Sequence, residues 1–163
     1  MLRFNSDHKF KIMQIADTQE FPAVSPDTLS LINNALDREK PDLVIFTGDQ
    51  IKGYSKKFKK DPAIIESTID ILVEPIAKRN IPFMVTYGNH DAQCGVDNRG
   101  QYKFYAKYDN FISGDLRNAD DVGTADIQIY SSTEDKPVFE LYIIDSHGKA
   151  KDGAGYALSL IHI

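Results

Sequence analysis

Apolar residues in the first half of the chain form short runs separated by polar residues, and each run predicts a strand. Phe10 to Ala16 (FKIMQIA) is a mostly apolar run closed by polar residues, as in a buried strand. Asp42 to Asp49 (DLVIFTGD) is nearly continuous in apolar and β-branched residues, which is typical of a central strand covered on both faces. Ile81 to Asp91 (IPFMVTYGNHD) predicts a third strand and its exit loop.

Helical spacing fills the two intervals between these runs. Ser25-Pro26-Asp27 supplies an N-cap with proline at the first helical position, and Pro41 ends that helix. Asp61-Pro62 begins a second helix in the same way. The apolar positions of the two helices are Leu29, Ile32, Ala35 and Leu36, then Ile64, Ile65, Ile69, Leu72, Val73 and Ile76. Three strands joined by two helices predict a parallel α/β sheet with right-handed crossovers.

The pattern changes after residue 100. Tyr102 to Tyr108 predicts a short helix. Ala125 to Ser132 and Val138 to Ser146 alternate like antiparallel strands around a turn-like segment, residues 133–137. We expect this hairpin either to extend the parallel sheet or to begin a second one.

Composition indicates one α/β domain and limits its partners. The chain has 163 residues, 42% of them apolar, which suffices for one core. With 24 acidic and 19 basic residues the net charge is −5, so no nucleic-acid or anionic-lipid surface is expected. The basic cluster Lys56 to Lys60 is interpreted as a solvated loop face rather than a phosphate clamp. Cys94 is the only cysteine, which excludes an intrachain disulfide.

No targeting or membrane-spanning segment is recognised in the chain. The N-terminus lacks the apolar core of a secretory signal, and no window approaches the ~18 apolar residues of a membrane span. We therefore expect a cytoplasmic protein by default, and its oligomeric state stays open.

Polar clusters follow each of the three predicted strands: Asp17, then Gly48-Asp49, then Gly88-Asn89-His90-Asp91. Since the carboxyl ends of parallel strands share one edge of a sheet, these clusters are expected to lie together. Carboxylates and an amide oxygen suit a pair of divalent cations. A lone Asp or Gly-Asp is equally well a helix cap or turn, whereas Gly-Asn-His-Asp has no packing reason to follow a buried strand. Gly48 and Gly88 are expected to allow sharp turns or a positive φ.

At these residues the sequence resembles the calcineurin-like metallophosphoesterase family, whose pattern runs Asp-x-His, Gly-Asp, Gly-Asn-His-Asp/Glu, a later His, and Gly-His-x-His. The stretch FKIMQIADTQ is similar to a bacterial branch near the purple-acid-phosphatase-like members. The resemblance covers residues 8–148. It implies the N-terminal portion of that family's αββα sandwich, with a parallel βαβαβ unit followed by an antiparallel hairpin.

The resemblance also implies a role for each cluster. Asp17 would bind a first metal ion, Asp49 would bridge two, and Asn89 would bind the second. His90 would contact the phosphate or protonate the leaving group, oriented by Asp91. The implied cofactors are two divalent ions (Mn, Fe, Zn or Mg), and the implied reaction is the hydrolysis of a phosphate mono- or diester.

Two departures from the family pattern affect these expectations. Gln19 stands where the family usually has His, so it either binds the first metal through its amide oxygen or hydrogen-bonds a metal-bound water. No Gly-His-x-His is present, and His147 is interpreted as a loop variant. We therefore expect an incomplete, inactive site in this chain.

The last six residues suggest where the native sequence ends. LSLIHI, residues 158–163, is what a common transposon-derived sequencing adaptor encodes in frame. We therefore expect an incomplete phosphoesterase domain over residues 1–157 and a non-native tail after it.

Two alternatives remain. The chain could belong to a non-catalytic metal-binding or interaction module that keeps the phosphoesterase fold, and a count of the histidine ligands in the full-length protein separates this from an enzyme. A nucleotide-binding α/β domain is disfavoured because no glycine-rich phosphate loop follows the first strand.

Overall fold

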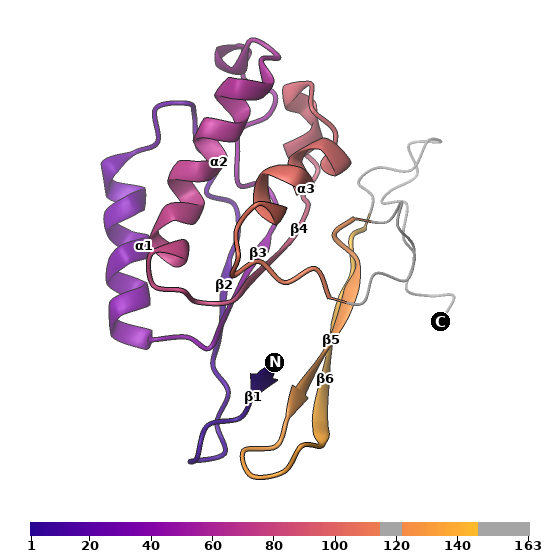
Figure 1. Cartoon of the computed structure of the whole chain (residues 1–163). Coiled ribbons are helices and arrows are strands. Elements are labelled where there is room, and N and C mark those ends of the chain that lie inside the picture. The colour runs from indigo at the N-terminus through magenta and orange to yellow at the C-terminus, as the bar shows by residue number, and fades with distance from the viewer. Residues whose placement is uncertain (115–121, 147–163) are drawn as a thin grey trace.

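A parallel three-stranded sheet forms the centre of the computed structural model, which describes residues 1–114 and 122–146 (Figure 1). Its order is β2-β3-β4, made of β2 (Ile12–Ile15), β3 (Leu43–Thr47) and β4 (Phe83–Thr86), and both pairings are parallel. This confirms the three predicted strands. The first is not buried as expected: its residues alternate between exposed and half-buried, because within the described residues it pairs with a strand on one side only.

Three α-helices connect or follow these strands. They are α1 (Pro26–Glu39), α2 (Pro62–Ala77) and α3 (Asn98–Ala106), with short 3-10 turns η1 (Lys56–Phe58) and η2 (Asp91–Cys94). The predicted caps are confirmed: Ser25 Oγ accepts the Asp27 N–H at 3.2 Å and Asp61 Oδ1 accepts the Ala63 N–H at 2.9 Å. α3 begins earlier than predicted, because Asp97 caps it by accepting the Gly100 N–H. None of the helices within the described ranges has the length and apolar character that crossing a membrane requires.

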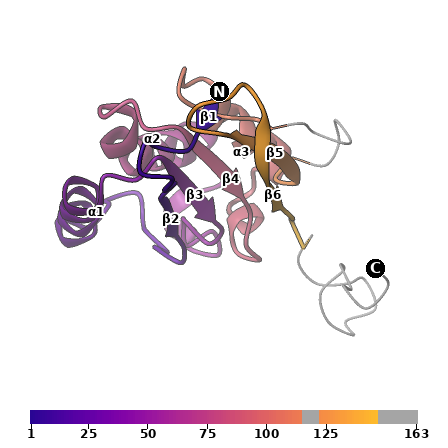
Figure 2. The ribbon, with the colours of Figure 1, turned by 90° about the horizontal axis from the view of Figure 1, so that it is seen from below.

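Alternate residues of β3 and β4 build two separate cores. Val44, Phe46 and Phe83 face the helices and pack with their apolar sides. Leu43, Ile45 and Met84 point the other way, toward the second sheet. Helices therefore cover one face of the parallel sheet and strands cover the other, as Figures 1 and 2 show from two directions. The described residues thus form three layers of the expected sandwich, helix, sheet and sheet.

The second sheet has the order β1-β5-β6. β5 (Ala125–Tyr130) and β6 (Pro137–Ile143) pair antiparallel, which confirms the hairpin and shows that it begins a new sheet. β1 (Leu2–Arg3) pairs parallel with β5 and was not predicted, because two residues are too few to show a periodicity. His147 and the suspected tail, residues 158–163, lie outside the described residues.

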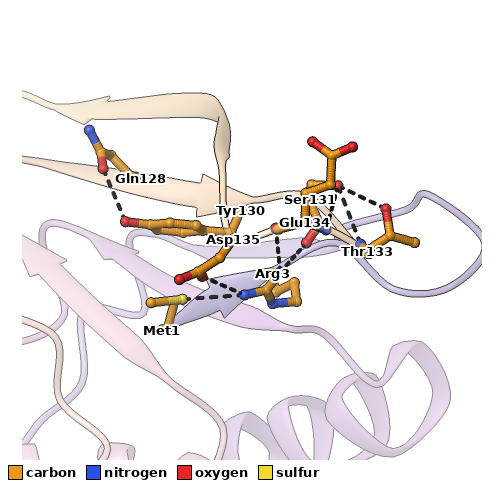
Figure 3. Close-up of polar contacts among 8 residues, drawn as sticks. All are labelled: Met1, Arg3, Gln128, Tyr130, Ser131, Thr133, Glu134 and Asp135. Carbon is orange, nitrogen blue, oxygen red and sulfur yellow. Dashed lines mark hydrogen bonds and ion pairs between the residues drawn. The ribbon is translucent and has the colours of Figure 1, made fainter.

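Arg3 joins the N-terminus to the β5–β6 turn (Figure 3). Its guanidinium donates to the carbonyl oxygens of Ser131 and Glu134, both at 2.6 Å, and to Asp135 Oδ1 at 3.0 Å. The Tyr130 ring lies 5.8 Å from the guanidinium carbon. A planar, forked donor group suits this set of acceptors better than an ammonium does.

We expect Arg3→Lys to destabilise the chain by about 1–2 kcal/mol, because an ammonium cannot reach all of these oxygens at once. Chemical denaturation measures the loss, and faster amide hydrogen exchange in the β5–β6 turn locates it. Lys9→Gln is the matched control, since Lys9 pairs only with the exposed Asp7. If Arg3→Lys leaves the turn as protected as in wild type, the guanidinium does not hold the hairpin.

Candidate metal centre

The loops after β2 and β3 run side by side beyond the end of the sheet. The Asp17 N–H donates to the Gly48 carbonyl at 3.0 Å, and the Gln19 N–H donates to the Asp49 carbonyl at 2.9 Å. A parallel bridge between Glu20 and Ile51 extends the pairing further. Sheet-like pairing thus continues through the loops and places Asp17 and Gln19 next to Gly48 and Asp49.

Three of the predicted site residues have left-handed backbone conformations. The φ angles are 53° at Asp17, 43° at Gln19 and 53° at Asp49. Such conformations are uncommon for residues other than glycine, and each costs about 1–3 kcal/mol unless its surroundings enforce it. They occur here at successive polar positions of two paired loops, which is where functional sites concentrate strained backbone.

Gln50 is the buried side chain that holds these loops to the strands. It is 1% exposed, and its Nε2 donates to the carbonyl oxygens of Ile15 at 3.1 Å and Gly48 at 2.8 Å. Thr18 Oγ1 in turn donates to the Gln50 carbonyl at 2.7 Å. Sequence analysis did not single out Gln50, although its polar side chain directly after a buried strand was a usable signal.

Gly48 and Gly88 are required for different reasons. Gly48 has φ 101°, and a Cβ added there would lie 2.3 Å from the Gly88 nitrogen. A Cβ on Gly88 would lie 2.2 Å from Asp49 Oδ1. The expectation of a positive φ is met at Gly48, whereas Gly88 is needed because the Asp49 side chain lies against it. This contact brings the third polar cluster to the second.

Asp91 lies beneath the loops and organises their backbone. Its side chain is buried, and its carboxylate accepts the N–H groups of Asp49 at 2.7 Å, Gln50 at 3.1 Å and Gly88 at 2.8 Å. Burial raises the pKa of the Asp91 carboxyl to about 6, while these backbone donors favour its ionised form. Asp91 therefore joins the loops after β3 and β4.

His90 lies at the surface of this arrangement. Its backbone N–H donates to Asp49 Oδ1 at 2.8 Å, and its Nδ1 lies 3.0 Å from Gln93 Oε1. Gln93 is thus the ring's side-chain hydrogen-bond partner in the described part of the chain, in the place expected of Asp91. Since an amide oxygen only accepts, Nδ1 carries the hydrogen and Nε2 is left for other partners.

Tyr54 also contacts the site and was missed by sequence analysis. Its ring lies 4.7 Å from the His90 ring in an edge-on arrangement, and its hydroxyl donates to Gln19 Oε1 at 3.5 Å. It comes from the loop after β3, five residues beyond Asp49, where no sequence pattern marked it. Tyr54 thus connects the first polar cluster to the third.

The side-chain oxygen atoms at these strand ends are suited to bind a metal ion. Asp17 is exposed, and within the described ranges no hydrogen bond involves its side chain or that of Asn89. Asp49 is buried and uses one carboxylate oxygen for the His90 N–H, so its other oxygen is available. Carboxylate and amide oxygens that have no hydrogen-bond partner among the described residues, on loops that the backbone holds together, fit a divalent cation.

The described residues do not supply a complete ligand set. Within residues 1–114 and 122–146, no three His, Cys, Asp or Glu side chains gather closely enough to hold a metal ion. Two of the four candidate ligands, Gln19 and Asn89, are amides. The oxygen ligands therefore fit part of a metal centre, and further ligands are needed to complete it.

Comparisons with known proteins identify a family for the chain. The family model of calcineurin-like phosphoesterases matches residues 10–159. The chain is 30% identical to the probable inactive purple acid phosphatase 14 of Arabidopsis thaliana, over 95% of the chain and 44% of that protein. It is 34% identical to the phosphatase DCR2 of Saccharomyces cerevisiae, over 95% of the chain and 30% of that protein.

A solved structure shares the fold. A dimetal phosphatase from Danio rerio superposes with a TM-score of 0.58 at 16% identity, over 89% of the chain and 48% of that protein. The chain thus spans less than half the length of each of these proteins.

Proposed function

Because the chain belongs to the calcineurin-like phosphoesterase family, we propose that the full-length protein hydrolyses phosphate mono- or diesters at a centre of two divalent metal ions. The observation that carries the proposal is the pairing of the loops after β2 and β3, with the loop after β4 held against them by Asp91. This backbone arrangement sets Asp17, Asp49 and Asn89 at one edge of the parallel sheet, where α/β folds bind their ligands.

Each candidate ligand has a proposed position. Asp17 would hold the first ion, with Gln19 either as a further ligand through its amide oxygen or as a hydrogen-bond partner of a metal-bound water; Asp49 would hold both ions, and Asn89 would hold the second. Bound there, the ions would supply Lewis-acid chemistry that polarises a phosphoryl group and acidifies water. Mn²⁺ and Mg²⁺ suit the two amide oxygens better than Zn²⁺ does, because amide oxygens are hard ligands.

His90 acts on the leaving group. Gln93 Oε1 accepts the Nδ1–H and so orients the ring; the imidazolium form of His90 would give its Nε2 proton to the departing oxygen and be left as neutral imidazole. Asp91 contributes indirectly. Its carboxylate accepts the backbone N–H groups of Asp49 and Gly88, and so fixes the backbone that carries the Asp49 side chain and the loop of His90.

A second candidate function is metal binding or protein interaction without catalysis. Two observations favour it: similar Arabidopsis proteins are named probable inactive purple acid phosphatases, and the described residues lack a third imidazole or carboxylate ligand at the site. For the 163-residue chain by itself we expect little or no hydrolysis.

Asn89→Ala in the full-length protein tests the enzymatic proposal. With Mn²⁺ present, wild type is expected to cleave p-nitrophenyl phosphate or its diester, and the variant to lose at least about a hundredfold in kcat/KM, because the second metal loses a ligand. Asn34→Ala, on the exposed face of α1, is the matched control. If wild type cleaves neither ester and Asn89→Ala binds Mn²⁺ as wild type does, the enzymatic proposal fails.

Gln19→His separates the two interpretations of Gln19. If the amide oxygen is a ligand, replacing it by imidazole is expected to tighten Zn²⁺ binding by about tenfold and Mn²⁺ binding by less, because imidazole is the softer ligand. Calorimetric titration of both ions into the full-length protein measures this. Gln128→His, exposed on β5, controls for an added surface histidine. Unchanged affinity for both ions would mean that Gln19 only hydrogen-bonds a metal-bound water.

A further inference from the structure

Two aromatic and two lysine side chains border the candidate metal centre; we call them the aromatic–lysine rim. They are Phe21 from the loop after β2, Lys52 and Tyr54 from the loop after β3, and Lys57 from η1. The rim meets the centre at Tyr54, whose ring contacts His90 and whose hydroxyl donates to Gln19. Tyr54 thus connects the rim to His90.

The aromatic rings hold the two ammonium groups. Lys52 Nζ lies 5.1 Å from the centre of the Phe21 ring and 5.5 Å from that of Tyr54. Lys57 Nζ lies 4.2 Å from the Phe21 ring. A cation within about 6 Å of a ring is attracted to the ring's face. Both ammonium groups therefore lie against one ring, although their positive charges repel each other.

Neither rim lysine is neutralised by a carboxylate of the described residues. Some other lysines of the described residues do have acidic partners: Lys11 pairs with Glu39, Lys78 with Glu74, and Lys107 with Glu66 and Asp70. In the described ranges Lys52 and Lys57 contact only aromatic rings, which leaves the N–H donors of each ammonium for an outside acceptor.

The position of Lys57 adds a contact to the basic cluster from which it comes. The sequence predicted a solvated loop face for Lys56 to Lys60, and all four lysines, Lys57 included, are exposed as expected. Lys57 in addition lies against the Phe21 ring and so joins Lys52 at the rim. An acidic chain of net charge −5 thus places two unneutralised cations next to the site expected to bind an anion.

We propose that the aromatic–lysine rim binds a second phosphate group of the substrate, so that the substrate is a bisphosphorylated small molecule; this identification of the substrate rests on the proposed function. One phosphate is cleaved beside His90, and the other accepts hydrogen bonds from Lys52 and Lys57. An anion between two like charges relieves their repulsion, and the rings hold the ammonium groups in place before it arrives.

The first test measures anion binding without catalysis. Full-length protein freed of metal with EDTA is titrated calorimetrically with pyrophosphate. The double variant Lys52→Gln/Lys57→Gln is expected to bind pyrophosphate about tenfold more weakly, because two contacting charges are lost. The control Lys56→Gln/Lys59→Gln removes the same charge from the same region and is expected to stay within about twofold of wild type. Equal weakening in both double variants, or none in the first, overturns the rim as a site.

The second test asks whether the bound anion belongs to the substrate. With Mn²⁺ present, Lys52→Gln/Lys57→Gln is expected to raise KM about tenfold for an adenosine bisphosphate and to leave adenosine monophosphate unchanged. An equal effect on both nucleotides, or a preference for a singly phosphorylated peptide, overturns the proposal. If neither nucleotide and neither p-nitrophenyl ester is hydrolysed while the pyrophosphate result holds, the proposed enzymatic function fails and the rim stands as an anion site.

Discussion

Replacing Asp91 by alanine is expected to lower the free energy of unfolding by about 3 kcal/mol. The carboxylate accepts three backbone N–H groups, from Asp49, Gln50 and Gly88. Alanine would leave these donors unpaired in a site where Asp91 itself is only 2% exposed. Each buried donor without a partner costs about 1–3 kcal/mol, and release of the buried carboxylate offsets part of the sum. Urea denaturation of the wild-type and variant proteins measures the difference.

Two further variants make the Asp91 result specific. Asp109→Ala removes an exposed carboxylate and is expected to change stability by less than about 0.5 kcal/mol. Asp91→Asn keeps the size of the side chain but turns an NH₂ group toward backbone N–H donors. We therefore expect it to recover less than half of the free energy of unfolding that Asp91→Ala loses. If Asp91→Ala costs no more than the Asp109 control, Asp91 does not hold the loops together.

Gly48→Ala is expected to lower the free energy of unfolding by at least about 3 kcal/mol and to weaken Mn²⁺ binding at the same time. Gly48 has φ 101°, and the added Cβ would lie 2.3 Å from the Gly88 nitrogen and 2.7 Å from its Cα. Backbone atoms cannot turn aside as a flexible side chain does, so the loops after β3 and β4 must move apart. Thermal unfolding and a Mn²⁺ titration of the full-length protein measure the two effects.

Gly100→Ala is the matched control for Gly48. Its added Cβ would meet the Val96 side chain, and the position lies in α3, where alanine is the better helix former by about 1 kcal/mol. We expect the free energy of unfolding of Gly100→Ala to stay within about 1 kcal/mol of the wild-type value. Equal losses at Gly48 and Gly100 would contradict a special role for the contact between the two loops.

Several features were accessible from the sequence because they depend on neighbouring residues. The caps Ser25 and Asp61 act within two residues of themselves, and both were identified correctly. The run from Leu43 to Thr47 was assigned as a central strand, since only burial on both faces explains so many consecutive apolar residues. The order of the polar clusters likewise implied their common edge, because parallel strands end together.

Other features escaped because they depend on distant residues. β2 is half-exposed since it is the edge strand of the sheet formed by the described residues, and nothing within Ile12–Ile15 specifies that. Gln50 and Tyr54 look like ordinary polar loop residues in the sequence. Their importance arises from contacts with Ile15 and His90, which are 35 and 36 positions away in the chain, respectively.

The sequence by itself determined the family, through the resemblance of its motifs, and the parallel α/β framework, through strand periodicity, because both are properties of local residue order. It also predicted the residues of the candidate metal centre. Only the tertiary structure decided how those residues are held: Asp91 accepts backbone N–H groups, Gln93 is the partner of the His90 ring, and Lys57 lies against Phe21. These contacts join loops whose positions the whole sheet sets. A pattern of neighbouring residues contains no such information.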